Sequence, residues 1–358
     1  MKVLVTGGAG FIGCKLSSVL VEKYDAEIIA YDNLLSQVHP SMKPPLAFHP
    51  KVKLVQKDVR DASAWRDFFS RYDPQYVLHF AAETGTAQSL TESARHASVN
   101  VTGTAEMLDG MIANGKKPKK ILLSSSRSIY GEGAWAGEDG KIFYPGRRNN
   151  KMLSGAKWDF ETIDGKPAKA LPHDGRVVMP NPTSVYGATK LAQENILSSW
   201  CEAFNVPLAI LRFQNVYGPG QSPFNPYTGI INIFHKMAYA GKAIEVYEDG
   251  EIGRDFVIVD DVVSACISAL FDEQDETIIA DVGFGKATTI LDTARIIAKL
   301  HNAPMPINCG KFRDGDIRWA VANISVMENR LGVRPTIGFE EGAKLVGDWL
   351  IENNFIAD

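Results

Sequence analysis

The chain has 358 residues and a formal net charge of −4 at pH 7, so it is long enough to bury a large core in one or two domains. The weak negative charge gives no reason to expect nucleic acid or a membrane surface as a partner, and no apolar run is long enough to span a bilayer. Four scattered cysteines, seven histidines without metal-ligand spacing and the lack of a signal peptide before the first strand predict a cytoplasmic protein with free thiols and no metal site.

The chain begins with an apolar strand, residues 1–6, which leads directly into a glycine-rich turn and then into a helix. Glycines spaced three apart allow a tight turn, a close approach of the backbone to a pyrophosphate, and close packing of the helix on the strand. Free N–H groups at the start of the helix favour phosphate. We therefore expect a dinucleotide to bind at Gly7, Gly10, Phe11, Ile12 and Gly13.

A second strand, residues 27–32, ends in Asp32, about 20 residues beyond the glycine turn. A carboxylate at this position binds the adenosine ribose hydroxyls and repels a 2′-phosphate, so the sequence predicts NAD rather than NADP. A third strand, residues 52–59, carries another acid that could reach the adenine. The other residues expected to bind the cofactor here are Asn33, Asp58, Val59, Phe80, Ala81 and Ala82.

Further strands are predicted at residues 76–82, 119–126, 207–215 and 277–282, with helices between them. This alternation predicts an α/β fold, a doubly wound parallel-sheet Rossmann domain with a smaller mixed α/β substrate lobe. Ligands of such sheets bind beyond the carboxyl ends of the strands, where Thr84 and Ser126 lie. We expect His79, inside the fourth strand, to be a core histidine rather than a ligand.

Tyr186 and Lys190 are four residues apart in a predicted helix and therefore lie on one face of it. A free phenol has a pKa of about 10 and is a poor base at pH 7, but a nearby ammonium group favours the phenolate. The same spacing also occurs on ordinary solvated helices. The glycine turn at the start of the chain favours the catalytic interpretation.

The spacing Gly7-x-x-Gly10-x-x-Gly13, followed by Tyr186-x-x-x-Lys190, resembles the extended short-chain dehydrogenase/reductase family. Four further stretches are similar to the sugar-nucleotide branch of that family, so that the resemblance covers almost the whole chain: residues 124–131, 211–220, 254–261 and 312–316. Within this branch the chain most resembles dTDP-L-rhamnose 4-epimerases, through residues 82–89, 225–230, 248–250 and 312–318.

The resemblance implies a role for individual residues. Tyr186 is the expected catalytic base and acid, and Lys190 is its partner, which bonds the nicotinamide ribose and lowers the pKa of the phenol. Ser126 takes the place of the residue that hydrogen-bonds the reacting sugar oxygen, and Asn100 matches an asparagine near the cofactor. The expected substrate-binding residues are Thr84, Ser126, Arg127, Asn215, Asn225, Tyr227, Arg254, Arg313 and Asp316.

Two of the arginines also fit this role on chemical grounds, because guanidinium groups suit phosphate. Arg254 and Arg313 match residues that hold the nucleotide diphosphate, although Arg254 alone would also fit an ordinary surface position. Asp316 fits a structural role as well as a ribose contact.

Two departures from the family pattern stand out. Residues 132–181 form an insertion between Ser126 and Tyr186, without the paired cysteines that similar epimerases carry there. It is either a surface excursion with a small core or a lid over the sugar. Arg127 and Ser128 stand where 4,6-dehydratases have an acidic pair, so dehydration is set aside.

The expected domains are residues 1–215, an NAD-binding Rossmann domain that contains the insertion, and residues 216–358, mainly the substrate lobe, with some strands and helices that return to the Rossmann domain. The lobe is expected to include a hairpin at residues 244–251 and helices at 288–301 and 339–353. The resemblance implies that helices near 93–114 and 184–204 pair across a homodimer interface, and ordinary packing on the sheet is the alternative.

The sequence thus predicts an NAD-dependent 4-epimerase of nucleotide-diphosphate sugars, which oxidises C4 transiently and returns the hydride to the opposite face. One alternative is an NAD(P)-dependent 4-ketosugar reductase or dehydrogenase, which exchanges its cofactor at each turnover, and Asp32 favours the epimerase. Another is a non-catalytic dinucleotide sensor, but such proteins typically lose the Tyr/Lys pair. The sequence leaves the nucleobase and the sugar open.

Overall fold

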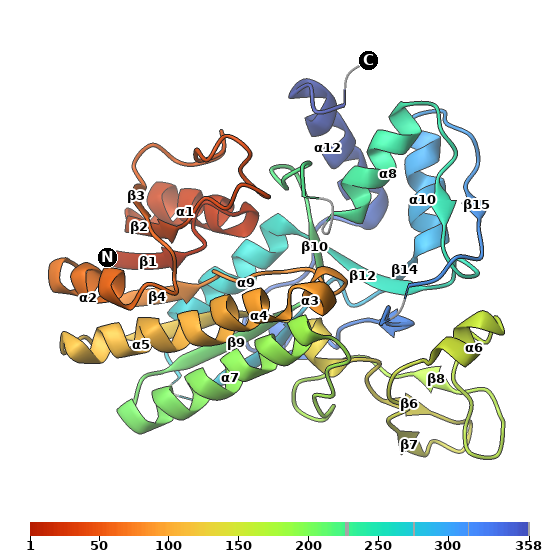
Figure 1. The fold of residues 1–358 in the computed structure, drawn as a ribbon, viewed down its shortest axis with the longest axis horizontal. Coiled ribbons are helices and arrows are strands. Elements are labelled where there is room, and N and C mark those ends of the chain that lie inside the picture. Colours follow the sequence, from red (N-terminus) through yellow and green to blue (C-terminus); the bar gives the residue numbers. More distant parts are fainter. Residues whose placement is uncertain (226–228, 275, 314, 357–358) are drawn as a thin grey trace.

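The computed structural model describes residues 1–225, 229–274, 276–313 and 315–356. Its main sheet is built from β1 (Lys2–Thr6), β2 (Glu27–Asp32), β3 (Lys53–Gln56), β4 (Tyr76–His79), β5 (Lys120–Ser126), β9 (Leu208–Phe213) and β13 (Ile278–Val282). These seven strands are all parallel and lie in the order β13-β9-β5-β4-β1-β2-β3 (Figure 1). The predicted doubly wound Rossmann sheet is therefore confirmed, including its late strands β9 and β13.

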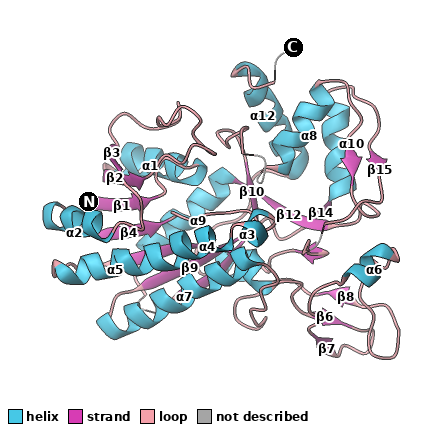
Figure 2. Cartoon of the chain, in the orientation of Figure 1, coloured by secondary structure: helices cyan, strands magenta, loops and turns pink. Residues whose placement is uncertain are grey.

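Helices cover both faces of this sheet (Figure 2). On one face α1 (Phe11–Tyr24) packs against α9 (Val259–Phe271), over a core that includes Val3 and Val5 of β1. On the other face lie α2 (Ala62–Arg71), α5 (Gly103–Ala113) and α7 (Val185–Phe204), over a core that includes Leu4. Successive residues of a strand point to opposite faces, which is why the buried part of β1 carries apolar side chains on both sides.

The helix predicted at residues 93–114 is present but not regular. It consists of α4 (Ser93–Ala97), a π-helical turn η1 (Ser98–Thr102) and α5, and the short helix α3 (Gln88–Thr91) precedes it. A π turn inside a helix widens the backbone by one residue and is frequently found at functional sites. Here it carries Asn100.

The second lobe has its own sheet and core. Strands β10 (Asn215–Tyr217), β12 (Gly253–Ile258), β14 (Ala287–Thr289) and β16 (Trp319–Ala320) form this sheet. Helices α8 (Ile230–Tyr239), α10 (Ile290–Leu300) and α12 (Phe339–Glu352) pack on one another around a third hydrophobic cluster, and the short helix α11 (Ser325–Asn329) lies against β13. The helices predicted at 288–301 and 339–353 are therefore present.

The hairpin predicted at residues 244–251 is wrong. β11 (Glu245–Val246) pairs in parallel with the distant β15 (Ile307–Asn308), and no ladder among the described residues links it to β12. The turn itself forms, with Glu248 at a φ of 54°, but the chain beyond Gly250 turns away into a different sheet. The sequence signalled the turn correctly, and only the strand pairing was misassigned.

The insertion is a small unit beside the second lobe (Figure 1). It contains β6 (Trp135–Ala136), β7 (Ile142–Phe143), β8 (Lys169–Ala170) and the short helix α6 (Asn150–Ser154), and it follows the 3-10 turn η2 (Arg127–Tyr130). Its three strands form one antiparallel sheet. The buried rings of Trp135 and Phe160 meet edge to face at 4.9 Å, so the insertion has a core of its own.

A buried ion pair fixes α7 to the main sheet. Glu194 of α7 accepts two hydrogen bonds from Arg212 of β9, at 2.8 and 3.0 Å, and a third from Ser125 of β5. Both charged side chains are buried. Since α7 also carries Tyr186 and Lys190, this ion pair sets their position relative to the carboxyl ends of the strands.

Replacing Glu194 by alanine leaves the Arg212 guanidinium buried without its carboxylate. Loss of one partner of a buried ion pair costs about 3–5 kcal/mol, and we expect the free energy of unfolding in urea to fall by that amount. Glu202→Ala, at an exposed position of the same helix, is the matched control and should change it by less than about 0.5 kcal/mol. Equal losses in the two variants would contradict the anchoring role.

Candidate active site

The glycine turn between β1 and α1 is too tight for side chains. Gly7 has a φ of +67°, and a Cβ there would lie 2.8 Å from the backbone nitrogen of Ala81. A Cβ on Gly13 would lie 2.5 Å from the carbonyl oxygen of Gly7. Gly10 caps the helix that starts at Phe11 without a side chain of its own, so the first N–H groups of α1 are open to a ligand. This turn fits the pyrophosphate of a dinucleotide.

Asp32 lies at the carboxyl end of β2, directly against this turn. Its carboxylate accepts hydrogen bonds from the backbone N–H groups of Ala9, at 3.0 Å, and of Leu34, at 2.8 Å. The carboxylate is thereby held beside the turn, where ribose hydroxyls would reach it.

Asp58 lies beside Asn33, whose amide donates a hydrogen bond of 3.2 Å to its carboxylate. The guanidinium of Arg60 binds both oxygens of Asp58 at 2.8 Å and lowers its pKa to about 2. Asp58 is therefore held in place as an anion at the expected edge of the cofactor site. Sequence reasoning missed Arg60, although an arginine two residues after an acid in a loop is a signal for such a pair.

Asn100 is fully buried in the π turn and binds the loop that follows β4. Its side chain accepts from the N–H of Glu83 at 2.8 Å and donates to the carbonyl oxygen of Glu83 at 3.1 Å. It also donates to the hydroxyl of Thr189 on α7 at 2.9 Å. Asn100 thus fixes α7 relative to the loop that includes Thr84 and residues 80–82.

Lys190 is buried in a polar chain beneath the site. Its ammonium group donates to the side-chain oxygen of Gln193 at 2.6 Å, and the Gln193 amide donates to Thr104 at 2.8 Å. Burial lowers the pKa of Lys190 to about 7. The ring of His79 ends this series of hydrogen bonds, with contacts to the hydroxyls of Thr104 and Thr6. Burial lowers the pKa of His79 to about 3, which agrees with the core histidine expected from the sequence.

Tyr186 and Ser126 lie together at the carboxyl end of β5. The hydroxyl of Ser126 accepts hydrogen bonds from the N–H and the hydroxyl of Ser128, at 3.2 and 2.9 Å. Burial raises the pKa of the Tyr186 phenol, while the Ser126 hydroxyl and the charge of Arg127 oppose this rise.

This arrangement differs from the sequence expectation in one respect. Lys190 was expected to lower the pKa of Tyr186, but in the structure its ammonium group is bound to Gln193, and the groups that favour the phenolate are Ser126 and Arg127. Arg127 is adjacent to Ser126 in the chain, so its proximity could have been foreseen. The bond from Lys190 to Gln193, three residues further along the same helix face, was also missed.

Arg127 and Arg254 form a cluster of positive charge next to Tyr186, in which Arg254 is buried and Arg127 is half-buried. The Nε atom of Arg127 donates to Asn215 at 2.9 Å, whereas its Nη1 atom is buried and has no hydrogen-bond partner among the described residues. Burial and the nearby charge of Arg254 lower the pKa of Arg127 to about 9. Two neighbouring cations with a buried, unused donor suit an anionic ligand, because a desolvated charge is costly without a counter-charge.

Of the remaining expected substrate residues, Asp316 has an interaction with this cluster. Burial lowers the pKa of Arg254, and the nearby carboxylate of Asp316 opposes this effect. The Asn225 side chain accepts a hydrogen bond from Gln37 at 3.3 Å. Arg313 lies over the ring of Tyr247, 4.9 Å from its centre. Tyr227 lies outside the described residues.

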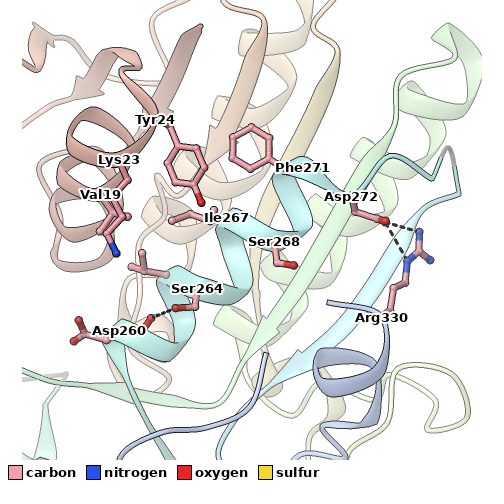
Figure 3. Close-up of a pocket in the computed structure, with 11 residues that line it drawn as sticks. Val19, Lys23, Tyr24, Asp260, Ser264, Ile267, Ser268, Phe271, Asp272 and Arg330 are labelled. Atoms are coloured by element: carbon pink, nitrogen blue, oxygen red, sulfur yellow. Dashed lines mark hydrogen bonds and ion pairs between the residues drawn. The ribbon is translucent and has the colours of Figure 1, made fainter. Parts of the chain in front are cut away.

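A separate pocket of about 530 Å³ lies between α1 and α9 (Figure 3). Tyr24 stacks on Phe271 at 5.0 Å within it, and Asp272 pairs with Arg330 at its rim. Its lining comes from the distal half of α1, away from the glycine turn, and includes none of the predicted site residues that the structure describes. The chemistry described above does not use this pocket.

The described part of the chain offers no cluster of metal ligands. Within it, no three His, Cys, Asp or Glu side chains are grouped so that they could hold a metal ion. None of the helices in the same ranges is both long enough and apolar enough to cross a membrane.

Comparison with known proteins gives consistent results. The NAD dependent epimerase/dehydratase family matches residues 3–149 and 162–282, with a gap that falls inside the insertion. The dTDP-L-rhamnose 4-epimerase of Burkholderia thailandensis is 47% identical over 351 residues, which cover 98% of this chain and 95% of that protein.

Solved structures of 4-epimerases share the fold along its whole length. The UDP-glucose 4-epimerase of Thermotoga maritima with UDP-glucose has a TM-score of 0.80 at 28% identity, covering 99% of this chain and 100% of that one. The UDP-glucose 4-epimerase of Thermus thermophilus in complex with NAD has a TM-score of 0.76 at 26% identity, covering 98% and 99% of the two chains.

Substitution of Gly13 by alanine tests the fit of the turn to the cofactor. The new Cβ would press on Gly7 and Gly8, so α1 must move away from the turn, and we expect the Kd for NAD to rise by at least about tenfold. Calorimetric titration measures this. Gly338→Ala is the matched control, because nothing lies within 4 Å of its Cβ, and it should bind NAD like the parent. Unchanged affinity in a folded Gly13→Ala variant would refute the assignment.

Proposed function

The chain belongs to the NAD-dependent epimerase/dehydratase family, and on that basis we propose that it is a 4-epimerase of nucleotide-diphosphate sugars whose substrate is dTDP-L-rhamnose or its C4 epimer. The observation that carries this proposal is the 47% identity to a dTDP-L-rhamnose 4-epimerase over almost the full length of both chains. The position of Ser126 and Tyr186 next to the neighbouring arginines Arg127 and Arg254 supports it independently.

The glycine turn and Asp32 would hold NAD, which would supply a reversible hydride acceptor for C4 of the sugar. Tyr186 removes the proton of the C4 hydroxyl and gives it back after the sugar has turned. Ser126 holds the reacting oxygen, which is a proximity effect. Burial raises the pKa of the Tyr186 phenol, and the Ser126 hydroxyl and the charge of Arg127 oppose this rise, which favours the ionised form that acts as the base.

Inversion at C4 requires the keto sugar to present its other face without leaving the protein. Arg254 and the unused donor of Arg127 bind the diphosphate and hold it while the sugar turns. Asn215 orients Arg127 through its hydrogen bond to Nε. The other residues that surround the nucleotide and the sugar in this proposal are Thr84, Asn225, Arg313 and Asp316.

We also propose that the protein is a cytoplasmic homodimer. Ile112 at the end of α5 and Phe204 at the end of α7 are 47% and 42% exposed, and pairing of these helices with those of a second copy would cover them. The four free cysteines suit a reducing compartment.

The reaction is tested by incubating the purified protein with dTDP-, UDP-, GDP- and CDP-hexoses in deuterated water, without added cofactor. We expect the C4 epimer of dTDP-L-rhamnose to form with no deuterium bound to carbon, because the hydride returns from the protein-bound cofactor. Deuterium at C3 or C5 would instead indicate an epimerase that works by proton transfer. A requirement for stoichiometric NAD(P)H would indicate a ketosugar reductase.

The role of Tyr186 is tested by Tyr186→Phe, which removes only the hydroxyl. We expect this variant to bind NAD like the parent and to lose general acid–base catalysis, with kcat lower by at least about a hundredfold. The comparison of kcat with the Kd for NAD separates chemistry from cofactor binding. Retention of most of the activity would show that another group is the base.

A further inference from the structure

The insertion is joined to the second lobe through one buried arginine. Arg148 is 2% exposed, and its Nη1 atom donates to the carboxylate of Glu248 at 2.7 Å. Its Nη2 atom donates to the backbone carbonyl oxygen of Asp316 at 2.8 Å, and its Nε atom bonds Glu132 at 3.3 Å. A single side chain of the insertion therefore binds both the turn at residues 247–250 and the segment that carries Asp316.

A second arginine makes the reciprocal connection. Arg318 lies in the lobe and binds Asp159 of the insertion at 2.7 Å and Asp249 of the turn at 2.7 and 2.8 Å. Its backbone N–H donates to the second carboxylate oxygen of Glu132 at 2.8 Å. The two arginines and their carboxylates thus form a closed network across three segments of the chain.

Such a network restricts its members to one arrangement. Arg148, Glu132 and Glu248 are each less than 5% exposed, and a buried charge that loses its partner is strongly destabilised. Alternative positions of the segment around Asp316 would break the bond from Arg148 to its carbonyl oxygen and leave a buried guanidinium donor unpaired. The insertion therefore fixes this segment in place.

The network also reaches Arg254, one of the two arginines of the positive cluster next to Tyr186. The backbone carbonyl oxygen of Arg318 accepts a hydrogen bond of 3.0 Å from the N–H of Gly253, which directly precedes Arg254. Burial lowers the pKa of Arg254, the carboxylates of Asp316 and Glu132 oppose this effect, and the charge of Arg148 adds to it. The side chain of Arg254 itself donates to the carbonyl oxygen of Gly253 at 2.9 Å. The charged groups of the network that lie near it are Glu132, Arg148 and Glu248.

We propose that Arg148 is a positioning residue for the nucleotide diphosphate, which holds the segment around Asp316 and the surroundings of Arg254 in their binding arrangement. The inserted segment is then a fixed support of the nucleotide site rather than a lid over the sugar. This inference rests on the proposed function, because it deepens the assignment of the same site. Arg148 acts through Asp316 and Arg254, and not by contact with the reacting atoms.

Arg148→Met removes the charge and keeps the apolar stem. The probes are dTDP and UDP alone, which bind without any reaction, and titration calorimetry gives their Kd values. We expect the Kd for the preferred nucleotide and the KM for the sugar nucleotide to rise by about tenfold, as for the loss of one charge-assisted hydrogen bond. The Kd for NAD should stay within about twofold and kcat within about threefold of the parent values, because Arg148 touches neither the cofactor site nor the reacting atoms.

Two further variants keep the test decisive. Lys151→Met, at an exposed position of α6, is the matched control and should bind dTDP like the parent. If Arg148→Met does not fold, Arg148→Lys decides by the same criteria, because it keeps a positive charge beside Glu248 but loses the second arm that reaches Asp316.

The outcomes separate this inference from the proposed function. Unchanged nucleotide affinity in a folded Arg148 variant overturns the positioning role of Arg148. An equal loss of NAD and nucleotide affinity overturns it as well. A lower kcat with release of free keto sugar, at unchanged nucleotide affinity, would show that the insertion is a lid. Weaker dTDP binding in a protein that epimerises no sugar would refute the proposed function and leave the positioning role in place, whereas a parent protein that binds neither dTDP nor UDP refutes both.

Discussion

All seven strands of the main sheet run in the same direction, so every one of them ends at the same edge. This constraint brings Asp32 from β2, Ser126 from β5 and the loop after β4 to one line, although long stretches of chain separate them. Tyr186 then lies beside Ser126 if the helix α7 is fixed in its position along the sheet. The buried pair of Glu194 and Arg212 fixes it there, which links the stability of the fold to the geometry of the site.

The sheet and the centre of the candidate site were predictable because their signals are local. A glycine turn between a strand and a helix, or a Tyr and a Lys one helical turn apart, can be identified from neighbouring residues. The partner of β11 could not, because β15 lies far along the chain and sequence alone favours the nearer strand. Arg148 likewise lies in a polar stretch without periodicity, and only the tertiary structure shows that it is buried.

The charges around the site are balanced in two different ways. Within the network of Arg148 and Arg318, each guanidinium is met by carboxylates and carbonyl oxygens of the chain itself. At Arg127, by contrast, burial leaves one donor without a protein partner in the described residues, and a second cation lies nearby. We propose that the first arrangement is a rigid support and that the second is a site for an anion. In this proposal the inserted segment supports substrate binding, a role that its sequence does not reveal.

The proposed reaction requires one C4 hydride to leave the sugar and to return to it inside the protein. It is tested most directly with dTDP-L-rhamnose that carries deuterium at C4, mixed with an equal amount of carbon-13-labelled, deuterium-free sugar and followed by mass spectrometry. We expect the C4 epimer to keep its own deuterium and none to appear in the carbon-13-labelled product. Loss of the label to water, or its transfer to the other sugar as a main product, would rule out return of the hydride to the same sugar.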